Sequence, residues 1–598
     1  MAISISIKKI KGVEYVYLIE SFRDPQTKRP TTRILQSFGR KEKLLADNPG
    51  ALEEIEAMAM KLRADSESYN TVLESRIGAA VNIASDLRNR SASLSCTPAP
   101  YRVLWEELGM ESYFRNFTRN YRIPYDLDLT VFYACLNRIV DPSSYRSGWL
   151  NRERFVFDFS SIKLDQIYES LGILSNRKEN IIKKLNESIG NLYKRDLTIA
   201  LYDVTTFYFE SFIEDDLRRR GMSKEHRTQE TQVVLGLLID SEGIPLTYEL
   251  FPGNTAEVHT LLEVVKKFKA DFKIETVTIV ADSGLNQYIN LQALDDAGFK
   301  YIVGFPPYIK LGKNDQDSLL DEERWNWHIN AEGERWGFKT LPMMIERTIK
   351  NTQTEENIDI NLDAIFIGTF STKRYFHDIE ELELKYAKAA SLVKKGPKAV
   401  AAAGRSGYKS FIKTSSDSVE LNNSLYEKRK KWCGYVGLLT NIKDLTPEEI
   451  YSQLRQLWRI EENFRIMKTN LEVRPVFVWT MEHIRGHFVL NYIGLVLQKV
   501  LQRKLKQTGL VVSANEIVRA LESMRVVKLV GVTKASGHLY TSCNDVAYAK
   551  SVTLSDGSPM PLTELCDKIL TVNGVEPPSA LETDTRLRKK LKVRLTLA

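Results

Sequence analysis

The stretch TIALYDVTTFYFE, residues 198–210, is a strand-length run of β-branched and aromatic residues with one acid, Asp203, near its middle. Such a run predicts a buried β-strand, where a charge is costly unless it is paired or metal-bound. The segments that follow are TQVVLGLLID (231–240), IPLTYELFPGN (244–254), EVHTLLEVVKKFK (257–269), VTIVADSGL (277–285), NQYINLQALDDAGF (286–299) and YIVGFP (301–306). Three strands in a meander and two helix–strand units predict an α/β sheet that starts antiparallel and continues parallel, the order of a ribonuclease H-like core.

The rest of the chain falls around this core, and 598 residues are enough for three or four domains. We expect a small basic β unit at 1–45, a mostly helical region at 46–195, the first part of the core at 196–307, a β-rich insertion at 308–430, the second part of the core at 431–508 and a C-terminal region at 509–598. The helical pattern of the second region starts near residue 50 and runs to about residue 92 before its first break.

Two long helices are predicted in the second part of the core. TPEEIYSQLRQLWRIEENFRIMKTNL, residues 446–471, reads as one helix, with Thr446 as N-cap and Glu449 three residues on as a capping box. HIRGHFVLNYIGLVLQKVLQRKL, residues 483–505, reads as a second long helix with an apolar face.

Acidic side chains at strand ends are the candidates for chemistry. Cutting a phosphodiester by two-metal catalysis needs carboxylates around two divalent ions roughly 3.5–4 Å apart. Asp203 lies in the first strand and Asp282 at the end of the fourth, and these two strands are adjacent in a ribonuclease H-like order. Each acid also has a structural alternative, since Asp203 could pair with a basic side chain and Asp282 could cap the next helix.

A third acid is expected from the helix at 446–471. Glu461 and Glu462 are adjacent, so only one can face inward, and Glu461 borders the apolar stripe formed by residues such as Ile460 and Phe464. Lys468 follows Glu461 by seven residues, two turns along the same face, where its ammonium group could hold a DNA phosphate. The alternative is an exposed charged face.

The composition and charge limit the class of protein. Hydrophobic residues make up 43% and charged residues 27%, and the net charge is +7. Residues 1–43 hold ten Lys or Arg against four acids, 428–431 reads KRKK, and Arg586 to Arg594 contains six basic residues and no acid. Separated basic clusters favour contact with phosphate at several places, although each could equally be a solvated face.

Several other sites and locations are disfavoured. The five cysteines lack metal-ligand spacing, the start of the chain alternates instead of forming a signal peptide, and no apolar run of about 18 residues is present. We therefore expect no zinc ribbon, no membrane partner and a cytoplasmic location. His483 and His487 are four apart on a helix, but without an HExxH pattern we expect core or phosphate-facing histidines.

The stretch WRIEENFRIMK, Trp458 to Lys468, resembles the signature of a large branch of DDE transposases from bacterial insertion sequences, in which the third acid lies in a Y-x2-R-x3-E-x6-K motif. Trp458, Glu461, Phe464 and Lys468 match this pattern. Leu454 and Leu457 stand where the Tyr and Arg are expected, and Arg459 or Arg455 could substitute. LYDVTTFYFES and ADSGL resemble the motifs of the first and second Asp, and NLEVRPVFVWT with the helix after it resembles a subfamily of longer transposases.

The resemblance implies a DNA transposase with Asp203, Asp282 and Glu461 as catalytic, metal-binding acids and two Mg²⁺ or Mn²⁺ ions as cofactors. It implies DNA contacts by Lys468, Arg459, Arg465 and Arg474, with Trp458 stacking on a flipped base unless it is a core residue. The partners would be the terminal inverted repeats and target DNA, bound by a homodimer at the bacterial nucleoid. By the same resemblance, the apolar helix 483–505 and the C-terminal region 509–598 could form the dimer contact. The alternatives are a ribonuclease H-like nuclease or resolvase without strand transfer, and an inactive DNA-binding relative.

Overall fold

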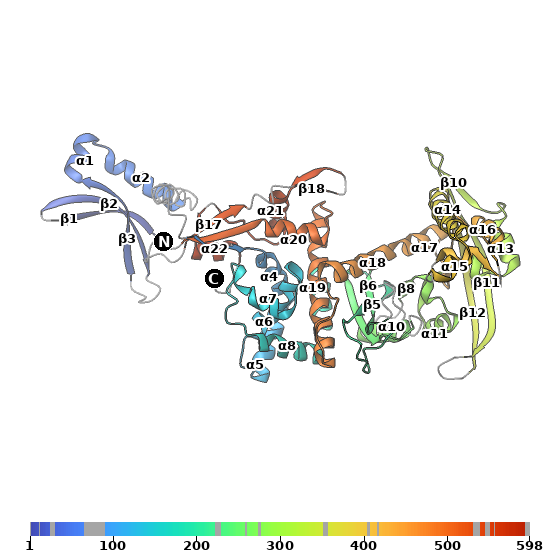
Figure 1. Cartoon of the computed structure of the whole chain (residues 1–598). Helices are drawn as coiled ribbons and strands as arrows, with labels where there is room; N and C mark the ends of the chain where they lie inside the picture. The colour runs from blue at the N-terminus through green and yellow to red at the C-terminus, as the bar shows by residue number, and fades with distance from the viewer. Residues whose placement is uncertain are drawn as a thin grey trace.

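The structure is a computed structural model. It is elongated, with the N-terminal unit at one end and the insertion at the other (Figure 1). The structure describes residues 2–10, 12–23, 30–64, 90–221, 229–256, 260–272, 277–350, 357–403, 407–415, 418–529, 539–544, 551–554, 557–579 and 581–592. No helix within these residues combines the length and apolarity needed to cross a membrane.

The N-terminal unit is an antiparallel meander, as the alternating sequence predicts, and two helices follow it in the chain, one of which packs on its sheet. Its elements are β1 (Ala2–Ile10), β2 (Val13–Arg23), β3 (Pro30–Arg40), α1 (Lys41–Asp47) and α2 (Ala51–Ala64). Val16 and Leu18 of β2 pack against Ile55 and Ala59 of α2 in a small core of their own. This unit therefore has a hydrophobic core separate from the rest of the chain.

The predicted helical region is confirmed over most of its described length. Its helices are α4 (Pro98–Glu107), α5 (Met110–Tyr121), α6 (Leu127–Val140), α7 (Tyr145–Leu150), α8 (Leu164–Asn176) and α9 (Lys178–Leu192). The helical pattern expected as far as residue 92 is wrong at its end, because β4 (Arg90–Ser95) is a strand that pairs with β16 (Met524–Leu529). A partner strand more than 400 residues away gives no signal in the local sequence.

The C-terminal region completes the helical region. It contains α20 (Ala514–Glu522), β17 (Leu539–Asn544), β18 (Ser551–Thr553), β19 (Pro559–Pro561), α21 (Leu562–Val572), β20 (Leu581–Thr583) and α22 (Asp584–Lys590), and its main sheet has the order β20-β17-β16-β4. The basic tail is partly structural, because Arg586 and Lys590 pair with buried Glu582 at 3.4 and 2.8 Å.

The central sheet has the predicted ribonuclease H-like topology. Its first strands are β5 (Ile199–Tyr208), β6 (Gln232–Asp240), β7 (Pro245–Pro252), β8 (Thr278–Ala281) and β9 (Lys300–Gly304), with helices α10 (Leu261–Phe272) and α11 (Tyr288–Asp296) between them. The order is β9-β8-β5-β6-β7; β5, β6 and β7 are antiparallel, whereas β8 and β9 run parallel to β5. The fourth strand therefore lies directly beside the first.

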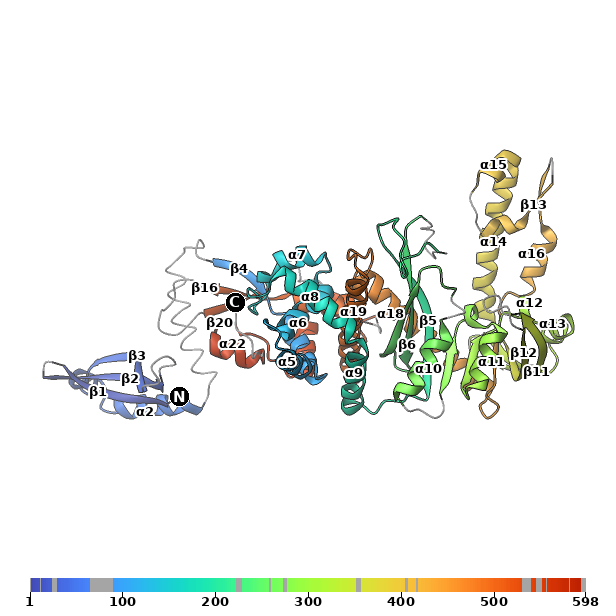
Figure 2. The same cartoon turned by 90° about the horizontal axis from the view of Figure 1, so that it is seen from below.

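The insertion lengthens this sheet. It contains α12 (Pro307–Lys310), α13 (Lys313–Leu320), β10 (Asn326–Ile329), β11 (Arg335–Lys350), β12 (Asn357–Ser371), α14 (Thr372–Lys394), α15 (Pro397–Ala402), β13 (Ile412–Thr414), β14 (Val419–Leu421) and α16 (Asn423–Lys430). β12 pairs with β15 (Tyr435–Thr440), which pairs with β9, so β10, β11 and β12 belong to one nine-stranded sheet. Figure 2 shows α14 and α15 projecting away from the sheet.

The helix predicted at 446–471 begins as expected but is interrupted. Thr446 and Glu449 form the capping box at the start of α17 (Pro447–Leu454). A 3₁₀ turn (Arg455–Leu457), α18 (Trp458–Arg465) and a π turn (Ile466–Asn470) follow. The π turn takes up an extra residue per turn, so the seven residues from Glu461 to Lys468 no longer equal two regular α-helical turns.

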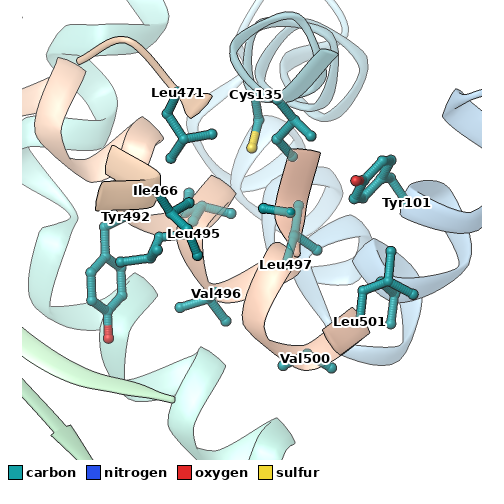
Figure 3. Packing of buried hydrophobic residues seen from close by; sticks show 14 of the residues in the cluster. Tyr101, Cys135, Ile466, Leu471, Tyr492, Leu495, Val496, Leu497, Val500 and Leu501 are labelled. Carbon is teal, nitrogen blue, oxygen red and sulfur yellow. The ribbon is translucent and has the colours of Figure 1, made fainter. Parts of the chain in front are cut away.

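The long helix α19 (Met481–Gln507) lies between the helical region and the sheet in both views (Figures 1 and 2). Figure 3 shows its residues Leu497 and Leu501 on the side of Tyr101 and Cys135 of the helical region, and Leu495 beside Ile466; all belong to one apolar cluster. The dimer contact expected from helix 483–505 is therefore wrong, because the apolar side chains of that helix are buried within this chain.

Candidate active site

The register of two strands brings two acids side by side. In the parallel pair β5–β8, Tyr202 is opposite Ala281, so the next residues, Asp203 and Asp282, are neighbours across adjacent strands. Adjacent strands lie about 4.8 Å apart. Asp282 comes directly after the end of β8, at the carboxyl edge of that strand.

Both acids belong to the same face of the sheet. Leu201 and Phe207 of β5 and Val280 of β8 belong to the apolar cluster that also contains α19, whereas Tyr202 and Ala281 belong to the cluster on the opposite face. Side chains alternate along a strand, so Asp203 shares the face of Leu201. By the same alternation Asp282 follows Val280, although the strand ends one residue before it.

A local hydrogen bond orients each aspartate. The backbone N–H of Val204 donates to Oδ1 of Asp203 at 2.7 Å, and the N–H of Ser283 donates to Oδ1 of Asp282 at 2.6 Å. Asp203 is partly buried and Asp282 is exposed. The cap predicted as an alternative for Asp282 is also present, since this bond caps a 3₁₀ turn at Ser283–Leu285.

The helix with the third acid covers this same face. Ile460 and Phe464 of α18 are buried in the cluster that contains Leu201 and Phe207, and α18 contacts β5. The side-chain amide of Asn463 donates to the carbonyl of Gly243, in the turn between β6 and β7, at 3.0 Å. α18 is thereby fixed to the sheet both by apolar packing and by this buried hydrogen bond.

The two adjacent glutamates have different surroundings. Glu462 accepts an ion pair from Nζ of Lys499 on α19 at 2.8 Å. Glu461 is exposed and forms no ion pair with any residue that the structure describes. Glu462 is thus committed to helix packing, and Glu461 is the acid that remains accessible on α18.

These acids provide some, but not all, of the ligands that a divalent ion needs. Carboxylate oxygens are the ligands that Mg²⁺ prefers, and Asp203 and Asp282 supply them from neighbouring strands. In the described parts of the chain, no group of three His, Cys, Asp or Glu side chains lies close enough to hold a metal ion. The structure therefore brings the two aspartates together, but it does not gather Glu461 with them.

Two cations flank the strand that carries Asp203. Nζ of Lys468 lies 5.9 Å from the ring centroid of Phe207, and the guanidinium of Arg474 lies 5.8 Å from that of Tyr208. Burial lowers the pKa of Arg474 from its ordinary value, which is so high that the group stays charged at neutral pH. Both cations lie beside β5, beyond Asp203 in the direction of the chain.

Comparison with known protein families shows which family the chain belongs to. Residues 194–497, just over half of the chain, match the family model described as the transposase DDE domain. The chain belongs to the DDE transposase family. Residues 3–69 match the N-terminal domain of IS1634 family transposases, so the protein is a transposase of an insertion sequence and a metal-dependent polynucleotidyl transferase.

Similarity to individual proteins is low. No curated protein sequence matches the transposase. It is similar to a chain in the cryo-EM structure of the piggyBac transposase synaptic complex with hairpin DNA, with 10% identity and a TM-score of 0.28 over 66% of this chain and 78% of that one. The pre-cleavage Mos1 transpososome gives 10% identity and a TM-score of 0.14, over 29% of this chain and 58% of that one. With TM-scores this low, these similarities do not support conclusions about the structure or function of the transposase.

A groove in the transposase lies beside the Glu helix. Its volume is about 1020 Å³, and it lies between β11, α14 and the segment from α17 to α18. The groove is lined by aromatic and basic side chains, among them Trp336, Phe338, Arg374, His377, Arg455, Trp458 and Arg459. This groove could not be predicted, because the insertion residues that form one wall have no motif and lie far from Trp458 in the chain.

Trp458 is a surface residue of the transposase. It is 57% exposed, so the alternative that it is a core residue on the apolar stripe is wrong. The guanidinium of Arg459 lies 5.5 Å from the Trp458 ring centroid. Arg465, the remaining predicted DNA contact, is exposed at the end of α18.

His487 has a structural role. It is buried, shares a hydrogen bond with the Tyr145 hydroxyl at 2.6 Å and contacts the Val473 carbonyl at 3.2 Å. Burial, with the nearby charge of Arg138, lowers the pKa of His487 to about 3. The expectation of a core histidine instead of a zinc ligand is confirmed for this residue.

Proposed function

We propose that Asp203, Asp282 and Glu461 are the catalytic acids and that together they would hold two divalent ions, Mg²⁺ or Mn²⁺. The main support for this proposal is the strand register that makes Asp203 and Asp282 neighbours. The helix α18, which covers the same face of the sheet, bears the accessible Glu461. Three carboxylates repel one another without a cation. Bound cations would therefore be needed for the three acids to act at one site.

The bound ions would activate the attacking oxygen and stabilise the leaving oxygen of an in-line displacement. The two aspartates, oriented by the N–H groups of Val204 and Ser283, would hold the cations that position the scissile phosphate. Lys468 and Arg474 would hold phosphates that flank it. In the first step the oxygen of water bonds to phosphorus at the end of the element, and the bond from phosphorus to the 3′ oxygen breaks, leaving a 3′-OH.

In the second step that 3′-OH attacks a phosphate of target DNA and displaces the 3′ oxygen of the target. The substrates would be the terminal inverted repeats and target DNA, bound by a homodimer at the bacterial nucleoid. Trp458, with Arg459 beside it, would stack on a base in the groove below the insertion. The Y-R-E-K branch stays a prediction, with Arg455 and Arg459 lining the groove where they could replace the missing Arg.

The regions at 1–45, 46–195 and 509–598 would contact DNA away from the active site. The N-terminal unit has its own core and a basic excess, which suits a DNA-contacting module. The KRKK run ends α16 and its cations lie at the surface of the insertion, which suits contact with phosphate there.

The test is the replacement of each acid by its amide in the full chain. Asp203→Asn, Asp282→Asn and Glu461→Gln should each lose Mg²⁺-dependent cleavage of DNA carrying the element end, while gel-shift binding of that DNA is kept. Asp296→Asn, on the exposed surface of α11, is the matched control and should cleave normally. A purified Asp203→Asn protein that still cuts would overturn the assignment.

Two further readouts separate the alternatives. Pre-cut ends mixed with target DNA should give joined products; cleavage without joining would instead indicate a nuclease or resolvase. Mn²⁺ binding followed by electron paramagnetic resonance should be lost in Asp203→Asn and Asp282→Asn even without DNA. Unchanged Mn²⁺ binding in both would exclude these residues as metal ligands.

A further inference from the structure

Two aromatic side chains near the end of β5, the strand that carries Asp203, are exposed to solvent. We call residues 476–479 the aromatic segment. Its Val476 and Val478 are buried, whereas Phe477 and Trp479 are each 54% exposed. The N–H of Val476 donates to the carbonyl of Tyr208 at 3.2 Å, which fixes the segment to the end of β5. The structure thus holds two large apolar rings in water on a fixed support.

The spacing of these rings suits a nucleobase. Alternating burial indicates an extended backbone, in which residues two apart are separated by about 6.6 Å. This is about twice the 3.4 Å spacing of stacked bases. One base can therefore stack between, or two bases upon, the rings of Phe477 and Trp479.

A buried cation with an unused donor lies beside the aromatic segment. Arg218 is only 8% exposed, and its guanidinium lies 6.0 Å from the ring centroid of Trp479. Its Nε donates to Asp215 at 2.7 Å. Its Nη1 is buried and finds no hydrogen-bond acceptor among the described residues, which is costly unless a ligand supplies one.

The loop that carries Arg218 is held rigidly. The N–H of Gly253 donates to the carbonyl of Leu217 at 3.1 Å, and Arg219 and Gln232 exchange backbone hydrogen bonds at 3.2 and 2.9 Å. A Cβ on Gly221 would meet the carbonyl oxygen of Gly253 at 2.1 Å, so only glycine permits this close approach. The Arg218 donor is therefore fixed in place before any ligand binds.

The location connects this surface to the proposed catalytic acids. Tyr208 is five residues beyond Asp203 on β5, about 16 Å along the strand. Lys468, over the ring of Phe207 on the same face as Asp203, lies along this path, and Arg474 lies over the next residue, Tyr208. A DNA strand leaving the acids on that face would meet Lys468 first and the aromatic segment next.

We propose that Phe477 and Trp479 stack on the bases of an unpaired DNA strand and that Nη1 of Arg218 donates a hydrogen bond to the same strand. The proposal rests on the DNA-cleaving function proposed above. A duplex hides the faces of its bases, so exposed rings of this kind select a single strand, and the phosphates of that strand are complementary to the cations beside it.

The experiment measures binding of a fluorescein-labelled oligothymidine of about 12 nucleotides, within the range of known single-strand site sizes. The full chain is used in EDTA, so no cleavage occurs, and fluorescence anisotropy gives Kd for the single strand and for a duplex of equal length. Phe477→Ala combined with Trp479→Ala should weaken single-strand binding about tenfold or more and leave duplex binding unchanged.

Matched variants show whether stacking is the cause. Trp479→Phe should retain most of the single-strand affinity, because a ring remains. Phe376→Ala removes an exposed aromatic residue (65%) from α14 and should change nothing. Arg218→Met should weaken single-strand binding, and thermal unfolding of every variant checks that it is folded.

Three results would overturn the proposal. They are an unchanged single-strand Kd in the double variant, an equal loss for single strand and duplex, or a change of sedimentation coefficient with no change in strand binding, which would mark an interface between copies. Failure of the catalytic assignment gives a different result, since Asp203→Asn would then still cleave while strand binding by the aromatic segment is unaffected.

Discussion

Glu461 and Glu462 differ in what they contact, although they are adjacent in sequence. The apolar stripe predicted Glu461 as the acid that faces inward, whereas Glu461 is exposed and Glu462 is the partly buried one. The ion pair of Glu462 with Lys499 could not be predicted, because it depends on how α18 and α19 pack. Likewise, the helical pattern around Trp458 gave no means to decide that this ring is exposed, since that depends on the insertion opposite it.

Replacing Glu462 by Ala should therefore affect stability. Lys499 is 7% exposed and would be left buried without its partner, so we expect the free energy of unfolding to fall by about 3 kcal/mol. Thermal denaturation followed by circular dichroism measures this as a lower Tm. Glu461→Ala is the neighbouring control, which should unfold like the wild type but not cleave; the reverse pattern would exchange the two roles.

His487 should make the protein sensitive to acid. Its pKa is about 3 when folded and near 6.5 when unfolded, so its stabilising contribution is complete above pH 6.5 and is lost as the pH falls toward 3. The free energy of unfolding should decline by up to about 1.4 kcal/mol per pH unit in that window from this group. In His487→Gln the decline in Tm between pH 6.5 and 4 should be shallower. An identical pH profile would mean that His487 is not buried in the neutral form.

At the scale of elements, local patterns predicted the strands and their order well. Buried runs with β-branched residues, separated by amphipathic helices, allow few topologies besides that of β5 to β9. The 3₁₀ and π turns around α18 were not predictable, because their residues are ordinary helix formers. The pairing of β12 with β15 was also missed, because it joins strands separated by α14 and α16.

The crossing of α19 and α8 gives a test of element packing. A Cβ on Gly486 would meet the carbonyl oxygen of Leu171 at 1.9 Å, and a backbone atom cannot move aside as a side chain can. Gly486→Ala should lower the free energy of unfolding by about 1–3 kcal/mol or more. Gly190→Ala in α9, where no atom lies within 4 Å, should instead leave stability unchanged or raise it. Equal Tm values for the two variants would contradict this packing.

At the scale of the whole molecule, the predicted boundaries at 195 and 509 do not separate independent cores. One apolar cluster contains residues of the helical region, the sheet, α19 and the C-terminal region, for example Trp105, Leu201, Leu497 and Leu565. The pairing of β4 with β16 adds a sheet made from both ends of this part. Sequence patterns indicate elements one at a time, so they do not reveal which regions share a core.

Truncations should reveal this organisation. A chain ending at residue 508 loses β16 and α21, exposes the cluster around α19, and should fail to accumulate as a folded protein. A chain starting at residue 90 loses the unit with its own core and leaves the shared cluster intact, so it should keep the Tm of the remainder and bind element-end DNA more weakly. Differential scanning calorimetry and gel shift measure both effects, and a well-folded 1–508 chain would contradict the shared core.

The position of β15 between β9 and β12 means that the insertion also shields the core from self-association. Without residues 308–430, one side of β15 would offer a row of unsatisfied peptide groups, a template for intermolecular strand addition and precipitation. In the intact chain the outermost strand on that side is β10, with four residues, which is too short to recruit another chain readily. Shortening this region during engineering would therefore trade a smaller protein for one prone to aggregate.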